Sequence, residues 1–227
     1  MLEKLKSLFQ TSRDDRPSLL QPAAAPTKAS REPAQFTRMS NGLEQFFFSI
    51  AGQGGMKILD LCGSPVTTKF LFEREHTVRP DAFHRALELA FGNGPEYLER
   101  QLEEDRIAIF VEHTLNHEEG EFDAVLLWDA VQFLRPELLT PALEQIRRIT
   151  RPGAPMLAIF HADERADTVP VFSYQIHDHN VLHLAERERR RPAQHFNNRA
   201  IERVFSTFGS TKFFLARNQL REVLVRR

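Results

Sequence analysis

Short runs of apolar residues recur along the chain from residue 56 onward, each followed by a polar or glycine-containing turn. Runs of this length between turn residues are typical of buried strands. They predict strands at 56–61, 107–111, 122–129, 156–160, 211–216 and 220–225. The stretch 169–184 alternates and predicts an additional strand or hairpin. Residues 76–81 form at most an edge strand, because Pro80 cannot donate to a sheet ladder.

Apolar residues at helical spacing separate these strands. They predict helices at about 40–50, 67–73, 81–91, 95–104, 135–149 and 198–205. The charge run 186–191 reads as a solvated loop. Strands that alternate with helices in this way predict an α/β domain with a mostly parallel sheet. The last two strands add an antiparallel pair at the C-terminal end, with a hairpin-like connection between them.

The first 39 residues follow a different pattern. Residues 1–12 form a short amphipathic helix candidate, which could bind a protein partner or a membrane surface, or could be a frayed terminal helix. Residues 13–39 contain four prolines and few large apolar side chains, so we expect a disordered linker. The folded domain is expected to span residues 40–227.

Composition narrows the class of protein. Hydrophobic residues make up 41% of the chain and charged residues 27%, as in ordinary soluble proteins. The net charge of −1 gives no reason to expect a nucleic-acid partner. Cys62 is the only cysteine, which excludes an intrachain disulfide and fits a cytoplasmic location. No apolar run approaches the roughly 20 residues of a membrane span, and no secretory signal is evident.

Several polar residues follow predicted strands. Asp60 and Asp129 end two of them, where ligands bind in open α/β sheets. The alternative for Asp60 is a structural role, as a cap for the next turn or helix. His161 follows another strand and is either an acid–base group or structural. The even spacing of His177, His179 and His183 allows a shared face, but no converging ligand is apparent, so we predict no metal site.

Three stretches together resemble the class I S-adenosylmethionine-dependent methyltransferases. They are 58–61, placed like the first strand of that family, 122–134, placed like its fourth strand, and 149–157, which is similar to the turn into its fifth strand. The resemblance implies a three-layer Rossmann-like fold. It also implies S-adenosylmethionine as the cofactor and methyl transfer to an acceptor that remains unknown.

The resemblance also implies residue roles. Asp60 would lie by the methionine end of the cofactor and Asp81 by the ribose hydroxyls. Glu112 or His113 would lie on the adenine side, and Trp128 and Asp129 would face cofactor and acceptor. No catalytic residue is implied.

The first loop departs from the family pattern. The family has a sequence close to D-x-G-x-G-x-G, whereas this chain has Asp60 followed by Leu-Cys-Gly-Ser-Pro-Val. Only Gly63 remains, displaced by one position, with Cys62 beside it, and we count both as cofactor-binding candidates. Such a degenerate loop keeps an alternative open. The protein could be an inactive member of the fold that acts as an interaction or scaffold module and docks through its N-terminal arm.

Overall fold

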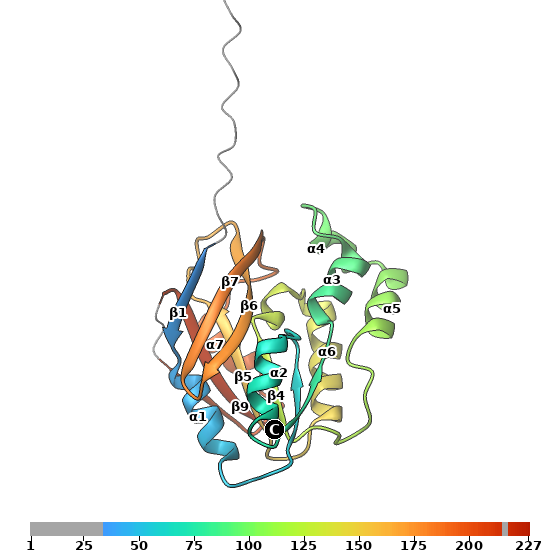
Figure 1. The fold of residues 1–227 in the computed structure, drawn as a ribbon. Helices are drawn as coiled ribbons and strands as arrows, with labels where there is room; N and C mark the ends of the chain where they lie inside the picture. Colours follow the sequence, from blue (N-terminus) through green and yellow to red (C-terminus); the bar gives the residue numbers. More distant parts are fainter. Residues whose placement is uncertain (1–33, 215–217) are drawn as a thin grey trace, which may run out of the picture. The chain divides into compact units, whose positions relative to one another are not determined.

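The computed structural model describes residues 34–214 and 218–227 (Figure 1). The helix expected at residues 1–12 and most of the expected linker lie outside this part of the chain. Residues 34–214 and 218–227 belong to one compact unit. None of the described helices combines the length and the hydropathy needed to cross a bilayer.

A six-stranded sheet in the order β3-β2-β4-β5-β9-β8 forms the centre of the unit. Its strands are β2 (Lys57–Asp60), β3 (Thr77–Pro80), β4 (Ala124–Trp128), β5 (Pro155–His161), β8 (Ser210–Phe213) and β9 (Leu220–Arg226). The first four strands are parallel to one another, whereas β9 pairs antiparallel with both β5 and β8. This is the mostly parallel sheet with a C-terminal antiparallel pair that the sequence predicts.

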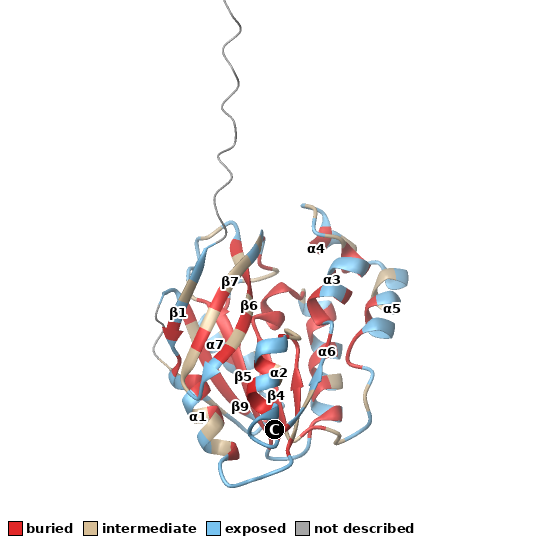
Figure 2. Cartoon of the chain, viewed as in Figure 1, coloured by how far each residue is buried: buried red, intermediate tan, exposed pale blue. Residues whose placement is uncertain are grey.

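Both faces of the sheet are covered. β4 and β5 are buried along their whole length (Figure 2), as expected for strands packed on both sides. Side chains of β4 alternate between two cores, with Val125 and Leu127 in one and Leu126 and Trp128 in the other. The fold therefore has three layers.

The helices divide between the two faces. The first core packs against α3 (Phe83–Phe91), α4 (Tyr97–Arg100), α5 (Glu104–His113), α6 (Pro136–Ile149) and α7 (Asn198–Val204). The second core packs against α1 (Asn41–Ile50), α2 (Pro65–Phe72) and a separate three-stranded sheet. A 3₁₀ turn, η1 (Ala130–Phe133), follows β4.

The three-stranded antiparallel sheet has the order β1-β7-β6. It consists of β1 (Gln35–Met39), β6 (Val169–Asp178) and β7 (Val181–Arg190). Two expectations fail here. Residues 35–39 are a strand rather than linker, because their backbone pairs with β7. The charge run is not a loop, because residues 186–190 continue β7 and pair with β6.

The strand predicted at 107–111 is wrong, because these residues form the middle of α5. Phe110 is buried against Phe83 and Phe91, whereas Ile109 and Val111 are exposed. The apolar run therefore supplies one anchor on a helix face instead of a fully buried strand. Because no strand forms at 107–111, β3 is the edge strand on this side of the described sheet, and its residues are mostly exposed.

Candidate functional site

A cavity of about 360 Å³ opens at the carboxyl ends of β2 and β3. β2 lies between β3 and β4 in the sheet, so the next strand in the chain, β3, is on one side of β2 and the strand after that, β4, is on the other. A position where the strand order changes direction in this way is called a switch point, and open α/β sheets bind ligands there. The lining comprises Leu61, Cys62 and Gly63 after β2, Pro80, Asp81 and Ala82 around the end of β3, His84 and Arg85 of α3, and Arg187 of β7.

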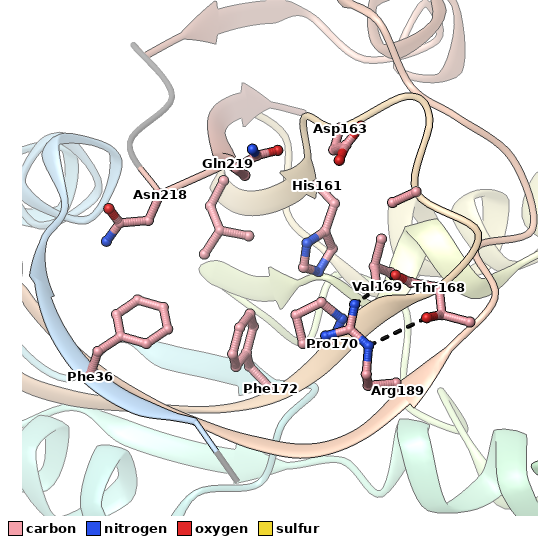
Figure 3. A pocket seen from close by; sticks show the side chains of 12 residues that line it. Phe36, His161, Asp163, Thr168, Val169, Pro170, Phe172, Arg189, Asn218 and Gln219 are labelled. Carbon is pink, nitrogen blue, oxygen red and sulfur yellow. Dashed lines mark hydrogen bonds between the residues drawn. The ribbon is translucent and has the colours of Figure 1, made fainter. Parts of the chain in front are cut away.

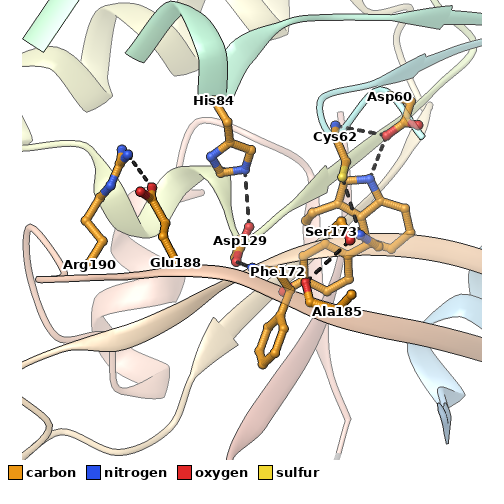
Figure 4. A network of polar contacts seen from close by, with 11 residues as sticks. Asp60, Cys62, His84, Asp129, Phe172, Ser173, Ala185, Glu188 and Arg190 are labelled. Atoms are coloured by element: carbon orange, nitrogen blue, oxygen red, sulfur yellow. Dashed lines mark hydrogen bonds and ion pairs between the residues drawn. The ribbon is translucent and has the colours of Figure 1, made fainter. Parts of the chain in front are cut away.

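Asp60 lies beneath this cavity and is fully buried. Its carboxylate accepts hydrogen bonds from the backbone N–H of Cys62 at 3.0 Å (Figure 4) and from that of Ser64 at 3.3 Å. The indole N–H of Trp128 donates a third bond, at 2.7 Å. Burial raises the pKa of Asp60, and these three donors act against that rise. The carboxylate therefore organises the loop after β2 through the chain's own donors.

Trp128 ends β4 in an unusual conformation. Its φ of 52° is in the left-handed region, which non-glycine residues rarely occupy. The indole ring stacks on Tyr174 of β6, with ring centroids 4.8 Å apart and an interplanar angle of 6°. The hydrogen bond to Asp60 and this stack together hold the strained residue in place. β6 thereby covers the carboxyl end of β4.

The loop after β2 is shaped by Gly63 and Ser64. Gly63 has a φ of 67°, which favours glycine because it has no Cβ. The Ser64 hydroxyl caps α2 by accepting a bond from the N–H of Thr67. The Cys62 sulfur accepts a hydrogen bond from the backbone N–H of Tyr174, at 3.3 Å. Burial raises the pKa of Cys62 to about 12, so the thiol is protonated and unreactive at neutral pH.

Asp81 borders the cavity, but its carboxylate points to partners of the chain itself. One oxygen accepts from the hydroxyl of Thr114 at 2.7 Å, and the other from the N–H of Leu115 at 3.1 Å. The second oxygen also lies 3.4 Å from Nε2 of His117. Both oxygens are thus engaged in tying the end of β3 to the segment after α5.

His84 and Asp129 form a buried pair at the inner wall. The Nε2 of His84 lies 3.4 Å from Oδ1 of Asp129, and the other carboxylate oxygen accepts from the N–H of Phe172 at 3.4 Å. His84 is 8% exposed, and among the described residues neither of its ring nitrogens has a hydrogen-bond partner within bonding geometry. A histidine held beside a carboxylate in a cavity wall is suited to hold or move a proton.

Two guanidinium groups lie at the cavity mouth. Arg85 comes from the first turn of α3 and Arg187 from β7, and both are exposed. No ion pair within the described part of the chain engages either one. They can therefore hold an anionic group of a ligand.

The structure brings together some of the residues that the sequence singles out. Cys62, Gly63 and Asp81 line the cavity, while Asp60, Trp128 and Asp129 lie buried behind it. His113 ends α5, is exposed and does not belong to the lining. Within the described ranges, no cluster of three or more potential metal ligands occurs.

Sequence reasoning missed His84, Arg85 and Arg187 as lining residues. His84 and Arg85 follow Asp81 by three and four residues, at the start of the next helix. This closeness in sequence to a candidate site residue could have identified them as lining residues. Arg187 carried no such signal, because β7 reaches the cavity only through the pairing of the smaller sheet.

Comparisons with known proteins find likeness only among solved structures. No family model and no curated protein matches the chain. A putative type 11 methyltransferase from Sulfolobus solfataricus is 11% identical, with a TM-score of 0.47, over 84% of this chain and 94% of the other. A SAM-dependent methyltransferase from Methanosarcina mazei is 12% identical, with a TM-score of 0.45, over 77% of this chain and 93% of the other.

A third solved structure contains ligands. It is the 1,6-didemethyltoxoflavin-N1-methyltransferase of Burkholderia thailandensis with bound 1,6-didemethyltoxoflavin and S-adenosylhomocysteine. It is 12% identical, with a TM-score of 0.45, over 82% of this chain and 77% of the other. The strand order and the layers of residues 34–214 and 218–227 make the fold Rossmann-like, with a mostly parallel sheet, a C-terminal antiparallel pair and cover on both faces.

Proposed function

We propose that the domain binds S-adenosylmethionine in the 360 Å³ cavity and transfers its methyl group to an acceptor. The observation that carries the proposal is the position of the cavity, at the carboxyl ends of β2 and β3 beside the switch point of the sheet. Its volume falls in the range of small-molecule pockets, about 300–1,000 Å³.

The lining offers groups that suit this cofactor. The guanidinium groups of Arg85 and Arg187 would hold the carboxylate of its amino-acid end, and the backbone of Gly63 would lie against the bound molecule. Asp60 and Asp81 would act indirectly, by fixing the two loops through the hydrogen bonds described above. The bound sulfonium supplies an electrophilic methyl group, and the chain contributes the alignment of the acceptor.

Isothermal titration calorimetry tests the proposal with S-adenosylmethionine and S-adenosylhomocysteine as ligands. We expect saturable binding of both, and about tenfold weaker binding in Arg187→Ala, the equivalent of 1.4 kcal/mol. Arg199→Ala is the matched control, because Arg199 is an exposed arginine of α7 outside the cavity. The absence of heat and of a thermal shift at millimolar ligand would refute cofactor binding.

One observation favours a second candidate, an inactive domain that acts as an interaction module. The carboxylates of Asp60 and Asp81, which the resemblance assigns to the cofactor, are both engaged by donors of the chain. In this case neither ligand binds, and the N-terminal arm mediates docking to a protein or a membrane surface.

Deletion of residues 1–33 tests the docking role while sparing β1. If the N-terminal arm is the docking element, the deletion should leave the melting temperature of the domain unchanged. It should also abolish association with the protein partner or the membrane surface. Association that persists after the deletion would show that the arm is not the docking element. A marked loss of thermal stability would show that the arm supports the domain instead.

A further inference from the structure

A second cavity, of about 440 Å³, lies at the carboxyl end of β5 (Figure 3). The smaller sheet contributes Phe36, Phe172 and Arg189 to its lining, and β5 contributes His161. It shares no lining residue with the cavity at β2 and β3. The two are therefore separate spaces, with separate requirements for a ligand.

The walls of this second cavity are largely apolar and aromatic. Phe36 and Phe172 meet edge to face, with ring centroids 5.7 Å apart and an interplanar angle of 88°. Val169, Pro170 and Leu220 extend the apolar lining. A flat ring can gain both buried area and aromatic contacts against such walls.

One buried polar group interrupts the apolar lining. His161 is 7% exposed, and its Nε2 has no hydrogen-bond partner among the described residues. Burial lowers the pKa of His161, so the ring is uncharged at neutral pH. Leaving a buried polar atom without a partner carries a free-energy cost. A ligand with a single hydrogen-bonding group would remove this cost.

The charged groups that line the cavity already have partners. The Arg189 guanidinium donates to the hydroxyl and the carbonyl of Thr168, at 3.3 and 2.8 Å, and lies 3.5 Å from Glu186. Asp163 accepts from the N–H of Arg165 at 2.9 Å. The two charges are opposite in sign, so the lining has no net charge to attract an ionic ligand.

We infer that this cavity is a second small-molecule site, whose ligand is an uncharged aromatic molecule with one hydrogen-bonding group, such as a phenol. The aromatic body would lie against Phe36 and Phe172, and the hydroxyl would meet Nε2 of His161. This site does not depend on cofactor binding in the first cavity.

Fluorine NMR of three small probes tests the inference on the full chain. The probes are 4-fluorophenol, 4-fluorotoluene and 4-fluorobenzoate, which differ in one substituent. We expect 4-fluorophenol to bind about 2- to 10-fold more tightly than 4-fluorotoluene, the equivalent of one hydrogen bond. The anionic 4-fluorobenzoate should bind most weakly. Failure of all three to bind at millimolar concentration, or tightest binding of the benzoate, would overturn the inference.

Substitution of His161 locates the probe. In His161→Phe, the affinity for 4-fluorophenol should fall to that for 4-fluorotoluene, which itself should change less than twofold. His161→Gln keeps a hydrogen-bonding group and should retain the preference for the phenol. His179→Phe, on the exposed turn between β6 and β7, is the matched control. An unchanged preference for the phenol in a folded His161→Phe protein would contradict the site.

Competition separates the two cavities. Saturating S-adenosylhomocysteine should leave 4-fluorophenol bound, since the cavities share no lining residue. Displacement of the phenol would show that the probe occupies the first cavity. Phenol binding without any cofactor binding would refute the proposed methyl transfer and leave the second site intact.

Discussion

The indole N–H of Trp128 donates to the carboxylate of Asp60 across 2.7 Å, and both residues are fully buried. These residues end two neighbouring parallel strands, β4 and β2. The bond therefore joins the carboxyl ends of the strands that flank the switch point of the sheet. The bond also means that the carboxylate of Asp60 is engaged by a donor of the chain itself.

Trp128→Phe should destabilise the protein, because Asp60 loses its indole donor and the strand end loses ring area against Tyr174. Leaving a buried acceptor without this partner costs about 1–3 kcal/mol. Urea unfolding measures the change, and Phe72→Leu is the control, since Phe72 is 75% exposed. A loss no greater than that of the control would contradict a structural role for the bond.

Asp60 should make stability fall as pH rises above about 4. Burial raises its pKa above the ordinary value of 3.8, so the folded protein holds this proton at pH values where the unfolded chain has released it. Unfolding free energy therefore decreases with rising pH between 3.8 and the raised pKa. Asp60→Asn should flatten this part of the curve in urea titrations at successive pH values.

Asp178 provides a control of opposite sign for the pH experiment. His179 lowers the pKa of this exposed carboxyl, so its contribution is present above 3.8 and is lost as pH falls through the lowered value. Asp178→Asn should leave the decrease between pH 3.8 and the raised pKa of Asp60 in place. If Asp60→Asn leaves the same decrease, Asp60 is not its source.

Cys62 should resist alkylation in the folded protein. Burial raises its thiol pKa to about 12, so the reactive thiolate is scarce at pH 8. Iodoacetamide should modify the unfolded chain fully and the native chain slowly, as read by intact mass, and Cys62 is the only cysteine to be modified. Rapid stoichiometric labelling of the native protein would show an activated thiol.

A buried ion pair joins β1 to β9. The guanidinium of Arg38 lies 2.8 Å from Glu222, whose other oxygen accepts from the N–H of Gly42 at 2.7 Å. Glu222→Leu should cost about 3–5 kcal/mol in urea unfolding, because it removes the carboxylate from a buried cation. The double variant Arg38→Met/Glu222→Leu should recover much of that loss. A double variant as unstable as Glu222→Leu would show that packing rather than charge dominates.

The sequence alone determined the central strands and their order in the chain. Runs such as 122–129 and 156–160 are apolar on both sides, and this pattern is typical of a parallel sheet covered by two layers. The turn residues and helical spacing between them then predicted most of the helices. The α/β class and the mostly parallel sheet followed from these local signals, whereas the three-layer Rossmann-like fold was implied by the resemblance of 58–61, 122–134 and 149–157 to a known family.

Local signals were insufficient where burial depended on distant partners. Residues 107–111 have an apolar run that suits a strand, yet only Phe110 finds a buried position, on α5 against α3. Residues 35–39 and 186–190 are polar enough for loops, but they become strands because β1, β6 and β7 pair with one another.

The candidate site shows the same division. The sequence placed Asp60 and Asp129 at strand ends, because the end of an apolar run is visible locally. Only the tertiary structure decided that Trp128 occupies the carboxylate of Asp60, and that His84, Arg85 and Arg187 line the cavity. The physical reason is that a hydrogen-bond partner or a cavity wall is set by strand pairing and layer packing, which bring together residues far apart in the chain.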